Sequence, residues 1–296
     1  MLAKPFVKWV GGKTQLLPEL RQRYPQVVKK YCEPFVGGGA VLFDVLDKYN
    51  PEEVLINDIN GELINCYRQI RDNTGNLIDL LNNFQLEYLS CSMDKRKEYY
   101  LKRRCTYNDL IENFTDADLV LKAALFIFLN KTCFNGLYRV NAKGQFNVPF
   151  NYAVNPAICD EENLISCAKV LQNVTLKVGD YKECSGFIDA GTFAYFDPPY
   201  RPLSTSSSFT SYSKDGFDDA KQIELGKFIN NMANKGAFIV VSNSDPKNAD
   251  ANDNFFDDLY ANFDISRISA SRMINSNAKK RGAINELLIC KVASVV

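Results

Sequence analysis

The sequence predicts an α/β fold in which a sheet domain is interrupted by a mostly helical insertion. Short apolar runs that are typical of strands occur before residue 60 and again after residue 170. Between them, from about 61 to 130, apolar residues recur at helical spacing. Three glycines at 37–39 join a strand signal to a helix signal, which favours a β-loop-α-β unit. A chain of 296 residues is long enough for such a core with an inserted second domain.

The individual elements are predicted from the order of turn and apolar signals. The β-loop-α-β unit continues from the glycines into a helix at 40–46 and a strand at 54–57. Polar, glycine-containing and aromatic residues at 131–155 favour irregular structure or a hairpin. The rest of the chain predicts helices at 161–171 and 219–234, and strands at 174–178, 193–196, 237–241, 263–268 and 286–291. Residues 1–60 and 161–296 are therefore assigned to the sheet domain, and 61–160 to the insertion.

Composition excludes several classes of site. The chain contains no histidine, which rules out Ser-His-Asp and Cys-His nucleophilic sites and His-ligated metals. Its nine cysteines include no C-x-x-C pair, so we expect neither a zinc ribbon nor a disulfide framework, and a reducing, cytoplasmic setting is favoured. No apolar run reaches the roughly 18 residues of a membrane span. The N-terminus lacks the apolar core of a signal peptide.

Charge is distributed unevenly, although 35 basic residues balance 35 acidic ones. Residues 1–30 carry seven Lys/Arg against one acid (+6), residues 91–150 carry ten against six (+4), and residues 265–296 carry six against one (+5). Residues 180–264 carry seven basic against fourteen acidic side chains (−7). This segregation favours a polyanion as the partner of one face of the protein.

The most informative segment is Asp197-Pro198-Pro199-Tyr200, which follows an apolar aromatic run at 193–196. Two prolines cannot extend a ladder, so the chain must turn as it leaves the sheet. The Asp197 carboxylate is then expected at the carboxyl end of the strand, where open α/β sheets bind ligands. Asp197 and the Pro198 carbonyl could accept hydrogen bonds from a planar amine, and Tyr200 could stack on its ring. The alternative is a loop after a core strand, with Asp197 capping the turn.

A second candidate site contains Gly37 and Asp58. The glycines can bring backbone amides close to a ligand at a helix N-terminus. Asp58 lies 21 positions after Gly37 and ends the next predicted strand, where an acid can accept hydrogen bonds from ribose hydroxyls. The third glycine of G-x-G-x-x-G would fall at Leu42, so the pattern favours an adenosine cofactor over a pyrophosphate dinucleotide. The alternative is a tight turn in which Asp58 caps the following helix.

Two further segments point to the same pocket. Lys13 lies in a glycine-kinked segment and could pair with a carboxylate of the ligand, while Trp9 offers an apolar wall or simply belongs to the core. Asp180 and Tyr181 follow the predicted strand at 174–178, where an acid and an aromatic ring could bind an adenine amine and stack on the base. Each signal is weak alone, and together they predict one pocket at the strand ends.

Nine motifs follow one another in a recognisable order: K-W-V-G-G-K (8–13), E-P-F-V-G-G-G (33–39), N-D-I-N (57–60), N-G-L-Y-R-V-N (135–141), F-N-V-P-F (146–150), V-G-D-Y (178–181), D-P-P-Y (197–200), F-T-S-Y (209–212) and S-N-S (242–244). This set resembles the Dam-type DNA adenine-N6 methyltransferases of the D12 class, and the resemblance extends from about residue 4 to 291. The motifs at 135–141 and 146–150 are the most specific, because in this family that segment reads DNA.

The resemblance implies a Rossmann-like, S-adenosylmethionine-dependent methyltransferase sheet at 1–60 and 161–296, with a target-recognition domain inserted at 61–160. The implied cofactor contacts, together with the strand-end residues above, are Trp9, Lys13, Phe35, Gly37, Asp58, Asp180, Tyr181 and Asp197. The flipped adenine would be held by Asp197, Pro198 and Tyr200. The Ser/Thr-rich stretch 203–213 directly follows this turn and is expected to close over the base, the alternative being a disordered surface loop. The implied DNA contacts are Lys8, Phe134, Leu137, Arg139 and Pro149, with Arg139 on a guanine and Phe134 where some relatives carry an intercalating side chain.

The implied reaction is methyl transfer from S-adenosylmethionine to N6 of adenine in double-stranded DNA, within GATC. Because the sulfonium sulfur already activates the methyl group, neither an enzyme nucleophile nor a metal is needed. The base must first leave the duplex, which costs roughly a few kcal/mol. Whether the enzyme works alone or protects DNA from a partner restriction endonuclease stays open, as does its oligomeric state.

Three alternatives share parts of this pattern. An N4-cytosine methyltransferase uses the same kind of turn, although Asp rather than Ser at position 197 favours adenine. Protein-glutamine methyltransferases carry Asn at that position. A catalytically silent nucleic-acid-binding subunit would have no need of Asp197, Tyr200 or Gly37.

Overall fold

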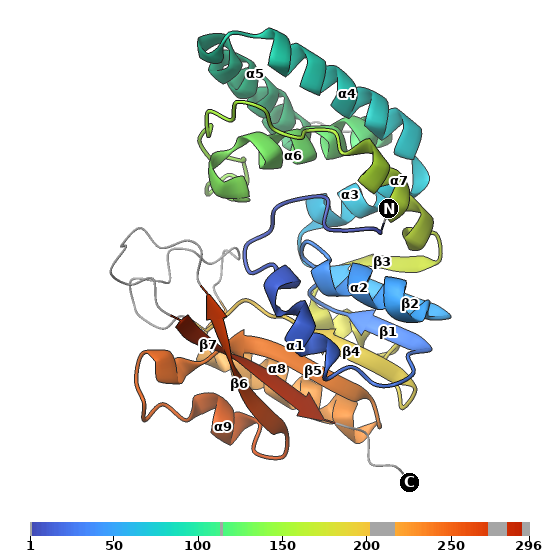
Figure 1. Cartoon of the computed structure of the whole chain (residues 1–296), viewed down its shortest axis with the longest axis vertical. Helices are drawn as coiled ribbons and strands as arrows, with labels where there is room; N and C mark the ends of the chain where they lie inside the picture. The colour runs from blue at the N-terminus through green and yellow to red at the C-terminus, as the bar shows by residue number, and fades with distance from the viewer. Residues whose placement is uncertain (1, 113–114, 202–216, 272–282, 292–296) are drawn as a thin grey trace. The chain divides into compact units, whose positions relative to one another are not determined.

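The computed structural model describes residues 2–112, 115–201, 217–271 and 283–291, and within them seven strands form one mixed sheet (Figure 1). The strand order is β3-β2-β1-β4-β5-β7-β6. The strands are β1 (Lys30–Glu33), β2 (Glu53–Asp58), β3 (Val174–Val178), β4 (Thr192–Phe196), β5 (Phe238–Ser244), β6 (Asp264–Ser271) and β7 (Ala283–Lys291). β1 pairs in parallel with β2 and β4, and β4 with β5, whereas β7 runs antiparallel to β5 and β6.

Nine α-helices are present in those same ranges, and the α/β fold class is confirmed. They are α1 (Leu17–Arg21), α2 (Ala40–Tyr49), α3 (Gly61–Asp72), α4 (Thr74–Ser90), α5 (Met93–Glu112), α6 (Leu119–Thr132), α7 (Glu161–Leu171), α8 (Asp219–Asn234) and α9 (Phe255–Leu259). Each predicted strand and helix after residue 160 is found within three residues of its expected bounds. The stretch 131–155 includes a hairpin, marked by antiparallel bridges from Cys133 to Phe150 and from Val140 to Phe146.

The sheet has its topological switch at β1. From β1 the chain passes to β2 on one side, and it later returns to β4 on the other side of β1. In open α/β sheets, ligands bind outside the carboxyl ends of the strands at such a point. The segment that follows β1 begins at Pro34, and the segment that follows β4 begins at Asp197. The fold therefore places two of the motif segments at the preferred edge.

The chain divides into two compact units. The first comprises Met1–Lys13, Val36–Lys48 and Asn57–Gly179, and the second comprises Thr14–Phe35, Tyr49–Ile56 and Asp180–Val296. Both units are therefore built from several segments of the chain. Compactness does not show what a segment binds, so the assignment of 61–160 to target recognition stays a prediction.

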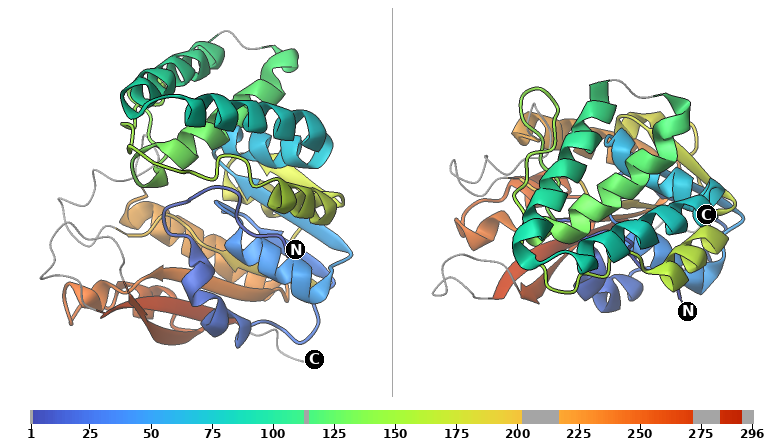
Figure 2. Two further views of the ribbon diagram at one scale, coloured as in Figure 1. Left: turned by 45° about the horizontal axis from the view of Figure 1, so that its top comes forward. Right: turned by 90° about the horizontal axis from the view of Figure 1, so that it is seen from above.

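The first unit is organised around α6. Ten of its fourteen residues are buried, on all sides of the helix, because α3, α4 and α5 pack around it. A helix that is apolar all round is stable only when it is enclosed in this way. Phe128 lies at the centre of an aromatic cluster with Phe84, Tyr88 and Tyr99. Both views in Figure 2 show the teal helices α4 and α5 beside the green α6.

The second unit has a sheet core. All five residues of β4 are buried, and Phe196 packs with Val241 of β5 and Leu225 of α8 in one apolar cluster. α8 contacts β5 along this face (Figure 1). Strands buried on both faces read as continuous apolar runs, which is why 193–196 could be recognised from the sequence. This rigid support ends at Phe196, one residue before the Asp-Pro-Pro-Tyr turn.

Candidate active site

The Asp197 carboxylate lies at the end of β4 and is held by a neighbouring strand. Its Oδ1 accepts a hydrogen bond of 2.8 Å from the Ser242 hydroxyl on β5. The Ser242 Oγ is in turn 2.9 Å from the hydroxyl oxygen of Tyr195. Both Ser242 and Tyr195 are completely buried. The carboxylate at the turn is thus joined to a buried pair of hydroxyls.

The rest of the Asp-Pro-Pro-Tyr turn is held from three further places. Gln222 of α8 donates to the Pro199 carbonyl oxygen at 3.0 Å, and the Tyr200 hydroxyl donates to Oε2 of Glu286 on β7 at 2.6 Å. The backbone N–H of Arg201 donates to Oδ1 of Asn243 at 3.4 Å. Burial, followed by the nearby carboxylates, raises the pKa of Tyr200 well above its usual value, so it stays a neutral phenol.

The turn after β1 depends on glycine. Gly37 has φ 49°, and a Cβ there would lie 2.7 Å from Cδ1 of Trp9, so no other residue fits without displacing the indole. The Tyr67 hydroxyl donates to the Gly37 carbonyl oxygen at 2.9 Å. Trp9 itself is half-buried, and its ring stacks near those of Phe126 and Tyr138 at centroid distances of 6.4 and 6.1 Å. Trp9 therefore forms a wall directly against the glycine turn.

Asp58 fastens that same turn. Its Oδ2 accepts from the Gly37 N–H at 3.0 Å, and its Oδ1 accepts from the Asn60 N–H at 2.9 Å. The cap of α3 is Asn60, whose side chain accepts from the N–H groups of Glu62 and Leu63. Burial raises the pKa of Asp58, and the hydrogen bonds from Asn60 and Gly37 oppose this shift. The Asp58 carboxylate thus joins the end of β2 to the glycine turn. The helix-cap alternative for Asp58 is wrong, because Asn60 caps α3.

The other predicted cofactor residues differ in exposure. Lys13 is only 4% exposed, and its Nζ donates to the Gly11 carbonyl oxygen at 2.5 Å. Phe35 is half-buried against the ring of Tyr181, at a centroid distance of 5.5 Å. Tyr181 lies in the apolar core of the second unit, so its ring is covered by protein. Asp180 is exposed and accepts from the Lys182 N–H at 3.0 Å.

The segment predicted to read DNA begins in a tight turn against Lys8. Residues Phe134–Gly136 form a 3-10 turn in which Asn135 has φ 56° and Gly136 has φ 64°. A Cβ on Gly136 would lie 2.5 Å from the Cβ of Lys8. The buried side chain of Asn130 accepts from the Lys8 N–H and donates to the carbonyl oxygens of Lys8 and Gly136, each at 2.8 Å. One amide therefore clamps the two segments together.

Arg139 lies on the hairpin that follows this turn and is exposed. Its Nε donates to Oδ1 of Asn147 at 2.7 Å, and its Nη2 donates to the Asn147 carbonyl oxygen at 3.3 Å. The two strands are also joined there by a bond of 3.1 Å from the Asn147 N–H to the Arg139 carbonyl oxygen. Asn147 thus occupies the Nε–Nη2 edge of the guanidinium, and a second edge is formed by Nη1 and the other hydrogen of Nη2.

The remaining predicted DNA contacts are also at the surface of the first unit. Phe134 is 51% exposed, Pro149 is exposed and Leu137 is half-buried. The Phe134 N–H donates to the Pro149 carbonyl oxygen at 2.8 Å, which places these two residues side by side. An exposed phenylalanine beside an exposed proline presents an apolar contact surface next to the turn.

Sequence reasoning missed the roles of the residues that hold the Asp-Pro-Pro-Tyr turn, namely Ser242, Asn243, Gln222 and Glu286. Only the motif S-N-S (242–244) drew attention to any of these residues, and the motif alone predicts no function for them. The predicted lid at 203–213 and the motif at 209–212 lie outside the described residues.

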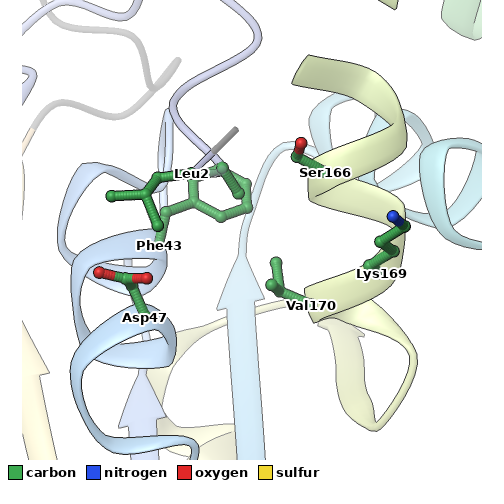
Figure 3. A pocket seen from close by; sticks show the side chains of 7 residues that line it. Leu2, Phe43, Asp47, Ser166, Lys169 and Val170 are labelled. Carbon is green, nitrogen blue, oxygen red and sulfur yellow. The ribbon is translucent and has the colours of Figure 1, made fainter. Parts of the chain in front are cut away.

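A cavity of about 150 Å³ lies elsewhere in the first unit. Figure 3 shows its side chains on the facing helices α2 and α7 and on the N-terminal segment. The lining residues are Leu2, Ala3, Phe43, Asp47, Ser166, Lys169 and Val170, none of which is a predicted site residue. In the described part of the chain, no cluster of three or more His, Cys, Asp or Glu side chains could hold a metal. No helix in that part is long and apolar enough to cross a membrane.

Comparison with known proteins gives a consistent picture over the whole chain. The model of the D12 class N6 adenine-specific DNA methyltransferase family matches residues 9–274. A type II methyltransferase of Methanocaldococcus jannaschii is 48% identical over 295 residues, which cover 98% of this chain and 99% of the relative. A type II methyltransferase of Lactococcus lactis subsp. cremoris is 40% identical over 289 residues, covering 97% and 94%. A DNA adenine methylase of Haemophilus influenzae is 32% identical over 288 residues, covering 96% and 92%.

Proposed function

The chain belongs to the D12 class of N6 adenine-specific DNA methyltransferases, and we propose that it transfers the methyl group of S-adenosylmethionine to adenine within GATC after flipping the base. Membership of this class sets aside the N4-cytosine, protein-glutamine and silent-subunit alternatives. The observation that carries the proposal is the Asp197 turn, which projects from a buried strand at the switch point of the sheet and is held by four other side chains. Neither the cofactor nor the sequence GATC is given by the family alone.

The glycine turn of the first unit fits an adenosine cofactor. Gly37 presents backbone at a place where a side chain would clash with Trp9. The Asp58 carboxylate accepts the backbone N–H groups of Gly37 and Asn60, and Ile59 adds a third backbone hydrogen bond. A carboxylate offers about four acceptor positions, so Asp58 retains capacity for a ribose hydroxyl. We assign the Trp9 ring and the Lys13 ammonium to the methionine end of the cofactor. Phe35, Asp180 and Tyr181 are assigned to its adenine, with the buried Tyr181 acting through its ring contact with Phe35.

The turn after β4 is assigned to the target base. When bound, S-adenosylmethionine supplies a methyl group that its sulfonium sulfur already activates. Asp197 and the Pro198 carbonyl accept the two N6 hydrogens and direct the nitrogen lone pair, while Tyr200 stacks on the ring. When the methyl group passes to N6, Asp197 would accept the proton that the nitrogen gives up.

The hairpin of the first unit is assigned to the DNA. Arg139 would read a guanine through Nη1 and Nη2, because Asn147 already holds its other edge. Lys8 would contact the site beside it, since Asn130 joins Lys8 to Gly136 of the turn. Phe134, Leu137 and Pro149 would supply the apolar contacts. The relatives named as type II methyltransferases support a further role, the protection of cytoplasmic DNA against a restriction endonuclease of the same specificity.

Modification mapping tests the proposal directly. Plasmid DNA from methylation-deficient cells that express the protein should carry N6-methyladenine at nearly every GATC and at few other sites, as read by long-read sequencing. Cells expressing the Asp197→Ala variant are the control and should carry none. Methyladenine in a different sequence would overturn GATC while leaving the class intact. Methyl transfer in vitro with S-adenosylmethionine as the sole methyl donor tests the cofactor assignment.

Replacing Asp58 with alanine should weaken cofactor binding by about tenfold or more, because a carboxylate hydrogen bond to a ligand is worth about 1.5–3 kcal/mol. Isothermal titration with S-adenosylmethionine measures this, and DNA affinity should change little. Asn60→Ala is the matched control, since it removes the cap of α3 and should cost about 1 kcal/mol of stability without affecting the cofactor. Equal loss of cofactor affinity in both variants would show that Asp58 acts only through the fold.

A further inference from the structure

Two buried hydroxyls beside Asp197 have no part in the chemistry proposed above. Tyr195 on β4 and Ser242 on β5 are both completely buried, and their oxygens are 2.9 Å apart. β4 and β5 pair in parallel, with Tyr195 opposite Val240. Ser242 lies two residues further along, which brings its hydroxyl to the Asp197 carboxylate at 2.8 Å. Burying hydroxyls inside a sheet costs free energy unless they are hydrogen-bonded, and here each bonds to the next.

The direction of these hydrogen bonds follows from the number of protons. An ionised carboxylate is only an acceptor, so Ser242 must donate its single proton to Asp197 Oδ1. The Ser242 oxygen then accepts, and Tyr195 is the donor of the second bond. Burial, and then the charge of Asp197, raise the pKa of Tyr195 well above its usual value, so the phenol keeps the proton that it donates. Tyr195 therefore donates to Ser242, and Ser242 donates to the Asp197 carboxylate.

We propose that Ser242 is a positioning residue for methyl transfer, which together with Tyr195 fixes the rotation of the Asp197 carboxylate. The inference rests on the proposed role of Asp197. A carboxylate that is bonded at one oxygen cannot rotate about its Cβ–Cγ bond without breaking that bond. Its second oxygen consequently keeps one direction, as a group that must direct the lone pair of an amine requires. Ser242 does not touch the substrate, and it acts only through Asp197.

The chain offers a matched pair of variants for the test. Thr192 begins β4, is 1% exposed, and its hydroxyl donates to Oδ1 of Asp189 at 3.0 Å. Thr192→Val therefore removes the same kind of hydroxyl–carboxylate bond at the opposite end of the strand that leads to Asp197. Ser242→Ala should lower kcat by about 10- to 100-fold, the range expected for a misplaced reacting group. Thr192→Val should leave kcat within about twofold.

The split between catalysis and binding separates positioning from general damage. In Ser242→Ala, the dissociation constants for S-adenosylmethionine and for a GATC duplex should stay within about twofold of the original protein, while kcat falls. Tyr195→Phe keeps the Ser242 donor and should give a smaller loss of kcat, also without loss of affinity. Tyr195→Phe removes the first of the two successive hydrogen bonds that end on Asp197. It therefore tests the positioning role if Ser242→Ala does not fold.

Several results would overturn the inference. The positioning role fails if Ser242→Ala loses no more kcat than Thr192→Val, or if kcat and both affinities fall together. If only Tyr195→Phe can be measured, an unchanged kcat has the same meaning. Failure of the proposed function looks different, because there Asp197→Ala itself would remain active. An inactive Asp197→Ala alongside a fully active Ser242→Ala would reject this inference alone.

Discussion

Replacement of Asp197 with alanine should reduce methyl transfer by at least about 100-fold, because the N6 amine loses the acceptor that orients it. The Ser242 hydroxyl would lose its acceptor in this variant, so the free energy of unfolding should fall by about 1–3 kcal/mol without abolishing the fold. Single-turnover transfer of a labelled methyl group to a GATC duplex measures the rate. Thermal unfolding and DNA binding confirm that the variant is folded.

Asp189→Ala is the control for this loss of charge. Asp189 lies just before β4 and pairs with Lys30 and Thr192. Because it is not at the carboxyl end of the strand, its replacement should leave the transfer rate within about twofold. A rate above about a tenth of the original in Asp197→Ala would correspond to a loss of under about 1.4 kcal/mol. Such a small loss would be incompatible with an essential acceptor.

Arg139→Ala should relax the choice of base at one position of the recognition sequence. A bidentate contact from arginine to O6 and N7 of guanine is worth about 1–3 kcal/mol of discrimination. The ratio of kcat/KM on GATC to kcat/KM on a duplex with the guanine replaced should therefore fall by about tenfold. Asn147→Ala, which releases the guanidinium from its fixed orientation, should give a smaller fall of the same kind.

Lys143→Ala separates base reading from phosphate binding. Lys143 is exposed on the same hairpin, and removing a phosphate contact should weaken binding to all sequences alike and reduce the salt slope by about one. If Arg139→Ala also lowers activity by the same factor on both duplexes, Arg139 contacts phosphate and another residue reads the guanine. Steady-state kinetics on the two duplexes at two salt concentrations give both quantities.

The sequence predicted those features that depend on local pattern. The run 193–196 is apolar at every position, and it is the fully buried β4. The helix at 161–171 has an acidic cap residue, Asp160, and apolar residues at helical spacing, and its bounds are those of α7. The glycine turn could be found for the same reason, since a positive φ at Gly37 restricts the residue type at that position.

The remaining features depend on side chains that meet only in the folded chain. Ser242 and Glu286 stand in apolar strands where nothing local distinguishes a hydroxyl or a carboxylate that holds a turn from any other polar residue. The sequence pattern allows Asp58 to cap the helix, but the cap is two residues later at Asn60, an offset too small for a pattern to resolve. Tyr181 follows a strand end, yet its ring is packed in the core rather than displayed.

Asn130 has a consequence for how the chain can vary in length. Its amide serves as donor and acceptor at once, to segments 122 residues and six residues away. Aspartate offers no donor, leucine offers neither group, and a threonine hydroxyl has one proton for two carbonyl oxygens, so none of these replacements makes all three bonds. The helices between these segments can lengthen or shorten at their loops at modest entropic cost. An insertion or deletion between Asn130 and Gly136 would break these hydrogen bonds, so we expect the length of this seven-residue segment to be fixed.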